Sequence, residues 1–288
     1  MNNRPVTLAQ LLTEQLNNKP PKDLTANSLP TMSLIKNPGR RAGLLYLLLM
    51  AAPLRLIYIP AKLFVPGDAA ATANNIATYE TLFRLGMLAE LFTGVAVIFV
   101  TLAFYDLFRP VNRKLAVLVV ILGGVLPAAM YFANVWTDAA ALTLARGRGG
   151  LLAASGRNVL TAFDEPQRQA LMMFFLHLHN QVINAAQIFW GIWLLPLAVL
   201  IYRSRFLPRF IAVWLIANGV GYVVLSVAVL LLPQYSVKVS NIVFPALVGE
   251  LVLMLWLIIR GVNMEKWKLL AQQRAEHNEN VGRVSNVT

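Results

Sequence analysis

The chain has 288 residues, of which 58% are hydrophobic and only 13% are charged, and its formal net charge is +12. Soluble domains average about 25% charged and about 45–50% apolar residues, so this composition indicates a membrane protein. The positive charge could suggest nucleic-acid binding, but the basic residues lie beside apolar segments, where they orient a membrane protein instead. The absence of cysteine excludes disulfides, thiolate catalysis and cysteine-ligated zinc.

The first 39 residues are polar and proline-containing, and they lack the apolar core of a signal peptide. We expect residues 1–39 to form a flexible cytoplasmic tail, in which Thr7–Leu16 can form a short amphipathic helix. At the other end, residues 263–288 are charged, and we expect a second cytoplasmic tail that is helical to about Glu276.

Between these tails, residues 40–262 contain six apolar segments long enough to cross a bilayer. The expected spans cover about residues 42–64, 84–107, 115–134, 171–209 up to its closing basic cluster, 210–232 and 242–259. The sequence therefore predicts an all-α integral membrane protein, a bundle of six transmembrane helices.

Two connections carry helix signals of their own. After the first span, Asp68 is placed to cap a short helix of small residues. The longest connection, 137–168, has a middle part rich in glycine and arginine, which we interpret as a solvated loop because the phosphate-binding pattern GxxxxGK[ST] is absent. At its end, Asp164-Glu165-Pro166 is typical of a helix N-terminus.

The distribution of basic residues predicts the orientation. Of the 25 Lys and Arg residues, 17 fall on the side of the two termini, seven fall on the opposite side and Arg55 lies within a span. Loops rich in Lys and Arg remain in the cytoplasm. We therefore expect both termini to be cytoplasmic and the protein to lie in a bacterial inner membrane, with the lipid bilayer as its surroundings and no nucleic-acid partner.

The fourth span is unusually polar for a segment in lipid, because it contains His177, His179, Asn180, Gln181, Asn184 and Gln187. At 100° per residue, five positions fall within an arc of about 80°. They are His177, Asn180, Asn184, Gln187 and Gly191. This stripe predicts a face packed against other helices, either to hold the bundle together or to line a ligand or ion pathway.

Three charged residues inside the spans need partners, namely Arg55, Glu90 and Glu250. A charge at mid-bilayer costs at least about 2.5–3.5 kcal/mol, and an arginine cannot avoid that cost by losing its proton. We expect Arg55 to pair with Glu90, with Glu250 as the competitor. The group could be a structural ion-pair network or a polar pocket open to the outside. A Glu–His–Glu metal site is the third alternative, although no local spacing supports it.

The ordered series of motifs resembles one bacterial membrane family, the domain of unknown function 4386. The matching segments are RRAGLLYLLL, YIPAKLFVPGDAAATANNI, FRLGMLAELF, FRPVNRKLA, LHNQVINAAQIFWGIWLLPLAVLIYRSRFLPR and PALVGE. The resemblance implies a membrane protein of six or seven helices with no established activity. It also implies recurring residues at the positions of Lys62, Asp68, Arg84, Glu90, His179, Gln187, Pro196 and Glu250. His177 does not match, so the resemblance favours His179.

These patterns leave three classes of function open. The leading interpretation is a protein that binds or moves a small ligand, ion or lipid headgroup, using Arg55, Lys62, Arg84, Glu90, His179, Asn184, Gln187 and Glu250. The second is an intramembrane enzyme that uses His179 with Glu90 and Glu250, against which the absence of HExxH and GxSxG motifs argues. The third is a structural or regulatory membrane partner. We assign no catalytic residue, metal or cofactor, and the sequence does not give the oligomeric state.

Overall fold

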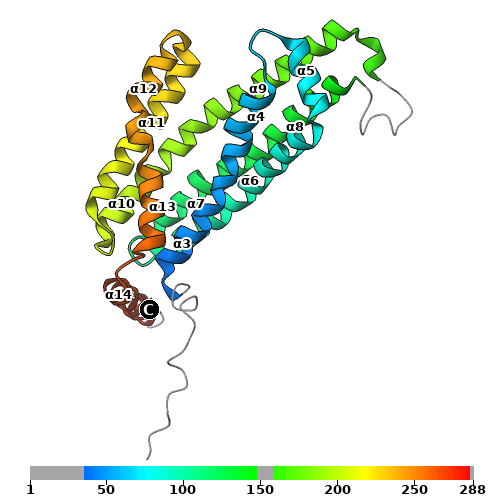
Figure 1. Ribbon diagram of the computed structural model, residues 1–288. Helices are drawn as coiled ribbons and strands as arrows, with labels where there is room; N and C mark the ends of the chain where they lie inside the picture. The colour runs from blue at the N-terminus through cyan, green and yellow to red at the C-terminus, as the bar shows by residue number, and fades with distance from the viewer. Residues whose placement is uncertain (1–35, 148–158, 286–288) are drawn as a thin grey trace, which may run out of the picture. The chain divides into compact units, whose positions relative to one another are not determined.

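The computed structural model describes residues 36–147 and 159–285, and in these parts of the chain it is helical, without strands. The described residues from Asn37 onward belong to one compact unit, and Figure 1 shows their long helices running side by side. The expected amphipathic helix at Thr7–Leu16 lies outside the described residues.

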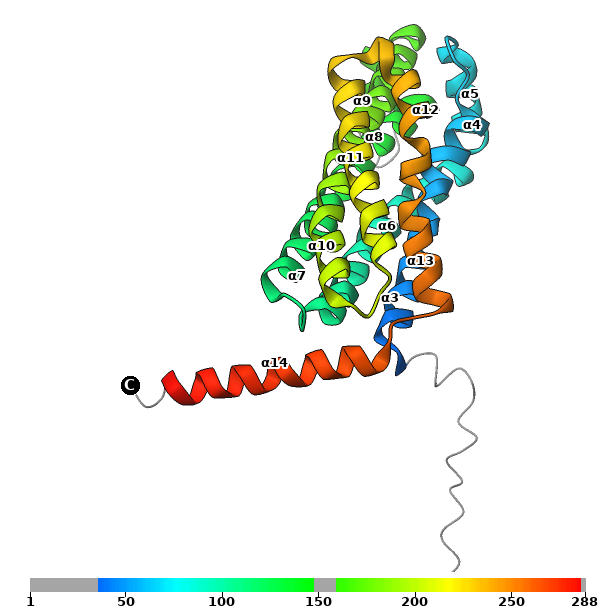
Figure 2. The ribbon, with the colours of Figure 1, turned by 90° about the vertical axis from the view of Figure 1, so that its left-hand side faces the viewer.

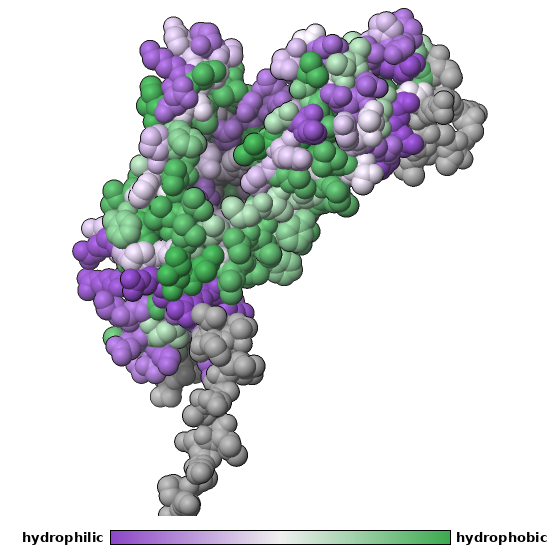
Figure 3. Space-filling model, viewed as in Figure 1, coloured by the Kyte–Doolittle hydropathy of each residue, from purple (hydrophilic) through white to green (hydrophobic). Residues whose placement is uncertain are grey.

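Six helical segments are long and apolar enough to cross a membrane, as the sequence predicts. These spans, numbered one to six, are Pro38–Leu63, Glu80–Phe108, Arg113–Arg146, Glu165–Ser204, Arg209–Leu231 and Pro233–Ile259. Many large apolar side chains on them are exposed, such as Phe99 at 55% and Val213 at 61%. Figure 3 shows apolar side chains across the middle of the molecule and polar ones toward both ends. A multi-pass membrane protein needs this distribution, because lipid takes the place of water around the middle.

Span one is built from short helical pieces rather than one regular helix. It consists of α3 (Pro38–Leu47), the 3₁₀ turn η1 (Leu48–Ala51), the π-helical turn η2 (Leu54–Tyr58) and α4 (Ile59–Leu63). Proline removes a backbone donor and clashes with the preceding turn, so Pro53 and Pro60 account for the breaks. Insertions of π geometry are frequent at functional sites, and η2 contains Arg55.

Spans two and three extend further than the sequence indicates. Span two is α6 (Glu80–Phe108), and span three joins α7 (Arg113–Val120), the π-helical turn η3 (Ile121–Val125) and α8 (Leu126–Arg146). The expected end of span three near residue 134 is wrong, because the helix continues for three more turns. The 137–168 connection is therefore helical at its start, and it becomes irregular at Gly147, which has a φ of 59°.

Span four joins α9 (Glu165–Ile192) and α10 (Leu194–Ser204), and span five is α11 (Arg209–Leu231). Span six joins the 3₁₀ turn η6 (Pro233–Tyr235), α12 (Ser236–Leu247) and α13 (Gly249–Ile259). The expected connection between spans five and six is therefore mostly helical. The break between α12 and α13 follows Pro245 and places Glu250 in the first turn of α13.

Both predicted helix caps are confirmed. The side chain of Asp68 accepts a hydrogen bond from the Ala71 amide at the start of α5 (Ala69–Thr78). At α9, the Asp164 carboxylate accepts from the Gln167 amide, and the Gln167 side chain accepts from the Asp164 amide. This reciprocal capping box satisfies backbone donors that a helix leaves free at its N-terminus.

Helices α9 and α11 cross at glycines. A Cβ added at Gly191 would meet the carbonyl oxygen of Gly219 and lie 2.8 Å from a methyl carbon of Val223. Small residues allow close helix packing of this kind in membranes, where apolar burial between helices contributes little. The sequence predicts this packing role for Gly191, and the structure confirms it.

The chain ends in α14 (Met264–Ser285), which crosses the end of the bundle instead of continuing span six (Figure 2). This helix is longer than expected from the sequence. Asn37 ties the two ends of the membrane domain together, because its side chain donates to the Val262 carbonyl at 3.0 Å and accepts from the Gly39 amide at 2.9 Å. The starts of span one and α14 therefore lie at the same end of the bundle.

Candidate functional site

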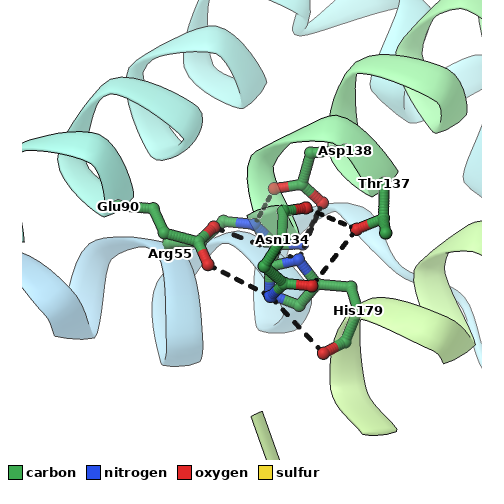
Figure 4. A network of polar contacts seen from close by, with 6 residues as sticks. All are labelled: Arg55, Glu90, Asn134, Thr137, Asp138 and His179. Atoms are coloured by element: carbon green, nitrogen blue, oxygen red, sulfur yellow. Dashed lines mark hydrogen bonds and ion pairs between the residues drawn. The ribbon is translucent and has the colours of Figure 1, made fainter. Parts of the chain in front are cut away.

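Arg55 is only 1% exposed and lies at the centre of a buried polar network. Its Nε and Nη2 donate to the two carboxylate oxygens of Asp138, each at 2.5 Å (Figure 4). The guanidinium also lies within 6 Å of two aromatic rings, 5.9 Å from the Phe64 centroid and 5.8 Å from that of Phe83. Two parallel hydrogen bonds to one carboxylate are the strongest arrangement available to an arginine.

The predicted pairing of Arg55 with Glu90 is wrong, and Glu250 is not its partner either. Asp138 falls within the connection expected at 137–168, outside the predicted end of span three near residue 134. The helix in fact continues to Arg146, and Asp138 is completely buried within it. One signal for this was present, since neither glycine nor proline occurs from Ala128 to Arg146.

Glu90 and His179 complete the network from spans two and four. Glu90 Oε1 accepts a hydrogen bond from Asn134 Nδ2 at 3.1 Å. His179 Nδ1 lies 3.1 Å from Asp138 Oδ1 and 4.0 Å from Glu90 Oε2. Neither nitrogen of His179, nor Glu90 Oε2, makes a hydrogen bond to any described residue. We refer to Arg55, Glu90, Asn134, Asp138 and His179 as the buried cluster.

The buried cluster contains more carboxyl groups than guanidinium groups. Two carboxyl groups, Glu90 and Asp138, face one guanidinium, and all three are at most 2% exposed. A buried charge without a partner costs several kcal/mol. The imidazole of His179 is the side chain of the cluster that lies near both carboxyl groups.

The same residues provide potential metal ligands. One ligand atom each from Glu90, Asp138 and His179 lie within 4.8 Å of one another. Histidine nitrogen and carboxylate oxygen are suitable ligands for zinc. However, both Asp138 oxygens already accept from Arg55, so a metal ion bound here would have to lie beside a guanidinium.

A second polar centre lies in a cavity of about 310 Å³ that we call the six-span pocket. Every span contributes to its lining, with Tyr46, Thr93, Tyr131, Trp190, Tyr222 and Glu250 as one example from each. The Tyr46 hydroxyl donates a hydrogen bond to Glu250 Oε2. Figure 3 shows the surface hollowed between the arm formed by α11 and α12 and the arm formed by α4, α8 and α9.

Aromatic side chains form much of the lining of the six-span pocket. The Trp190 ring stacks on Tyr131 with centroids 6.3 Å apart, and it meets Tyr222 edge-on at 5.9 Å. Tyr46 and Trp193 form another edge-on pair at 6.4 Å. The pocket therefore combines aromatic rings with one carboxyl group.

The buried cluster and the six-span pocket are neighbours but share no lining residue. Thr93 of the pocket is one turn along α6 from Glu90, and Tyr131 is one turn along α8 from Asn134. Arg55, Glu90, His179 and Glu250 were expected to lie at overlapping depths, and the structure places Glu250 apart from the other three, in the six-span pocket.

The remaining predicted residues lie apart from both centres. Arg84 pairs with Glu80 at 2.7 Å at the surface, and Lys62 is exposed above the Tyr79 ring. On α9, Gln187 Nε2 donates to Asn184 Oδ1 at 3.5 Å.

The helical stripe predicted on span four is wrong at its outer end. His177 and Asn180 are exposed, whereas His179 is completely buried. The inward face of α9 instead includes Met172, Leu176 and His179. The preference for His179 that came from the family resemblance is therefore consistent with its burial.

A family model matches most of the chain. The model described as "Domain of unknown function (DUF4386)" matches residues 41–261, which is more than half of the chain. The chain therefore belongs to this family, and the resemblance noted from its motifs is confirmed. Neither curated proteins nor solved structures gave a match to the chain.

Proposed function

We propose that this member of the DUF4386 family binds a small organic cation in the six-span pocket. The observation that carries the proposal is the position of Glu250, a carboxyl group among aromatic rings in a cavity lined by all six spans. Pockets for small ligands are typically lined by apolar and aromatic side chains with a few polar groups that fix the ligand.

The charge of the pocket favours a cation over an anion. Among the residues that line it, Glu250 is the one with an ionisable acid or base group other than tyrosine hydroxyls, and no lysine or arginine contributes. The cation–π contacts between described residues all lie outside the pocket. A ligand cation would provide the counter-charge that Glu250 lacks, and its alkyl groups would contact the ring faces.

We also propose that the protein lies in a bacterial inner membrane with both termini in the cytoplasm. The distribution of basic residues supports this orientation. The hydrogen bond from Arg40 Nη2 to the Ile259 carbonyl at 3.2 Å joins the start of span one to the end of span six. This contact supports placing both ends of the membrane domain on the same side of the membrane.

Two matched probes test the ligand class. Benzyltrimethylammonium is a quaternary ammonium ion, and neopentylbenzene is its uncharged carbon isostere. At about 100 times the dissociation constant, a ligand stabilises by about 2.7 kcal/mol, or roughly 5–11 °C in melting temperature for a chain of this size. We expect this shift in neutral detergent for the cation alone, and we expect Glu250→Gln to abolish it.

Glu80→Gln is the matched control, because Glu80 is a partly exposed glutamate paired with Arg84 and Arg146 outside the pocket. This variant should keep the shift. An equal response to both probes, unchanged in Glu250→Gln, would show a pocket without cation preference. If neither probe shifts the melting temperature, the binding proposal fails.

An intramembrane metalloenzyme is the second candidate, and one observation favours it. Glu90, Asp138 and His179 converge closely enough to share an ion, with Asp138 in place of the Glu250 expected from the sequence. The guanidinium of Arg55 on Asp138 weighs against a divalent ion, so we predict no stoichiometric metal. Elemental analysis that finds about one equivalent of zinc, lost in His179→Ala, would replace our proposal with this one.

A further inference from the structure

A second cavity, of about 500 Å³, lies at the end of the bundle where α14 crosses it. Three arginines line it: Arg109 from the turn between α6 and α7, Arg113 from the first turn of α7, and Arg274 from α14. Tyr105 and Trp267 are the aromatic residues of the lining. We call this cavity the arginine pocket.

The side of the pocket that α14 forms is anchored to the membrane domain. Trp267 Nε1 donates to the Leu107 carbonyl at 3.0 Å, and the Asn263 amide donates to the Phe206 carbonyl at 3.2 Å. Met264 and Leu270 pack against the hydrophobic core of the bundle. Because these contacts join α14 to the ends of spans two and four, the pocket is part of the folded domain.

The positive charge of the pocket is largely unmatched within the described residues. Arg109 Nε lies 3.8 Å from Asp106 Oδ1, but these side chains are 59% and 66% exposed, so the pair contributes little. No ion pair with a described residue involves Arg113 or Arg274. Three guanidinium groups around one cavity suit a phosphate, which accepts several charge-assisted hydrogen bonds at once.

The apolar surface next to the arginine pocket favours a membrane lipid as the source of that phosphate. Exposed apolar side chains follow one face of α6 toward the pocket, and this face includes Leu88, Phe92, Val95, Phe99 and Leu102. The spacing of three and four residues continues from Leu102 to Asp106 and Arg109. An acyl chain lying along this face would bring its headgroup to the arginines.

We propose that Arg109, Arg113 and Arg274 form a site for the phosphate of an anionic membrane lipid. Tyr105 and Trp267 lie at the same level, and aromatic residues of these types are enriched where a membrane meets water. Basic pockets on the cytoplasmic side of membrane helices bind anionic headgroups in this way. Such a lipid would join α14 to span two, and this role is independent of the ligand of the six-span pocket.

Native mass spectrometry of the purified protein in a neutral detergent tests the site. Dioleoylphosphatidylglycerol is the anionic lipid, dioleoylphosphatidylcholine has the same acyl chains without net charge, and glycerol 3-phosphate is the soluble phosphate. We expect one tightly bound phosphatidylglycerol, and an affinity that falls by about tenfold or more in Arg113→Gln/Arg274→Gln. Both arginines are exposed, so this variant should fold.

The control variant is Lys114→Gln/Arg203→Gln, which removes the same charge from exposed residues that do not line the pocket. It should keep the affinity within about twofold. Equal losses of phosphatidylglycerol affinity in the two variants would show that general surface charge causes the binding, and the proposed site would be wrong. Equal binding of phosphatidylcholine would overturn the preference for anionic lipid. Binding of glycerol 3-phosphate that displaces the lipid would overturn the membrane as the source of the phosphate.

Discussion

Replacing Asp138 with Asn should destabilise the protein more than any other single neutralisation of a carboxylate. The change leaves the Arg55 guanidinium 1% exposed and without its counter-charge. Two hydrogen bonds to a charged group contribute about 1.5–3 kcal/mol each, which agrees with the loss of about 3–5 kcal/mol found when one partner of a buried ion pair is removed. The melting temperature should fall by roughly 6–20 °C for a chain of this size.

A double-mutant cycle isolates the interaction from other effects of the substitutions. Arg55→Met combined with Asp138→Asn should recover much of the loss, because the double variant has no buried charge without a partner. The free energy of unfolding is measured by SDS titration in mixed micelles. Glu80→Gln, which breaks partly exposed pairs, should cost no more than about 1 kcal/mol.

The opposite pattern of coupling would refute this reasoning. Additive losses for Arg55 and Asp138, together with strong coupling between Arg55 and Glu90, would restore the pairing expected from sequence. If neither carboxyl group couples to Arg55, the guanidinium must be stabilised by water or by a ligand instead of by a fixed partner.

Three further predictions concern the proposed orientation, the packing of two helices and a helix cap. Reporter fusions after Leu232 should be external and those after Val262 internal, and the reverse result would overturn the orientation. Gly191→Leu should lower stability by about 1–3 kcal/mol, because its side chain meets the Gly219 backbone, and a melting temperature equal to the wild type would contradict this contact. Asp164→Ala should cost about 1 kcal/mol by removing the α9 cap, and an unchanged melting temperature would show that the capping box adds nothing.

Hydropathy and helix signals predicted most of the fold because they depend on local sequence. The six spans and the caps at Asp68 and Asp164 were found in this way. The boundaries were less accurate, because polar residues that are satisfied inside a bundle look the same as polar residues in a loop. Asp138 is the clearest case, since its buried partner lies 83 residues away in the chain.

The candidate site was only partly predictable for a related reason. The cost of burial made Arg55, Glu90 and Glu250 stand out, and the family resemblance pointed to His179. Which of them meet depends on how the helices are rotated, and a helical wheel for one span does not give this. The wheel selected the side of α9 with His177, whereas packing against span three, where His179 meets Asp138, buries the side with His179.

The two polar centres should respond differently to mutation, because one contains the buried Arg55–Asp138 ion pair and the other is a cavity with space for a ligand. Asp138→Asn should lower stability while the folded fraction still binds benzyltrimethylammonium, since no residue of the buried cluster lines the six-span pocket. Glu250→Gln should lose that binding with a smaller loss of stability, because Glu250 is partly exposed. Calorimetric titration of both variants against the wild type makes the comparison. If Asp138→Asn abolishes binding below its melting temperature and Glu250→Gln does not, the ligand contacts the buried cluster, and the charge that it neutralises is that of Glu90.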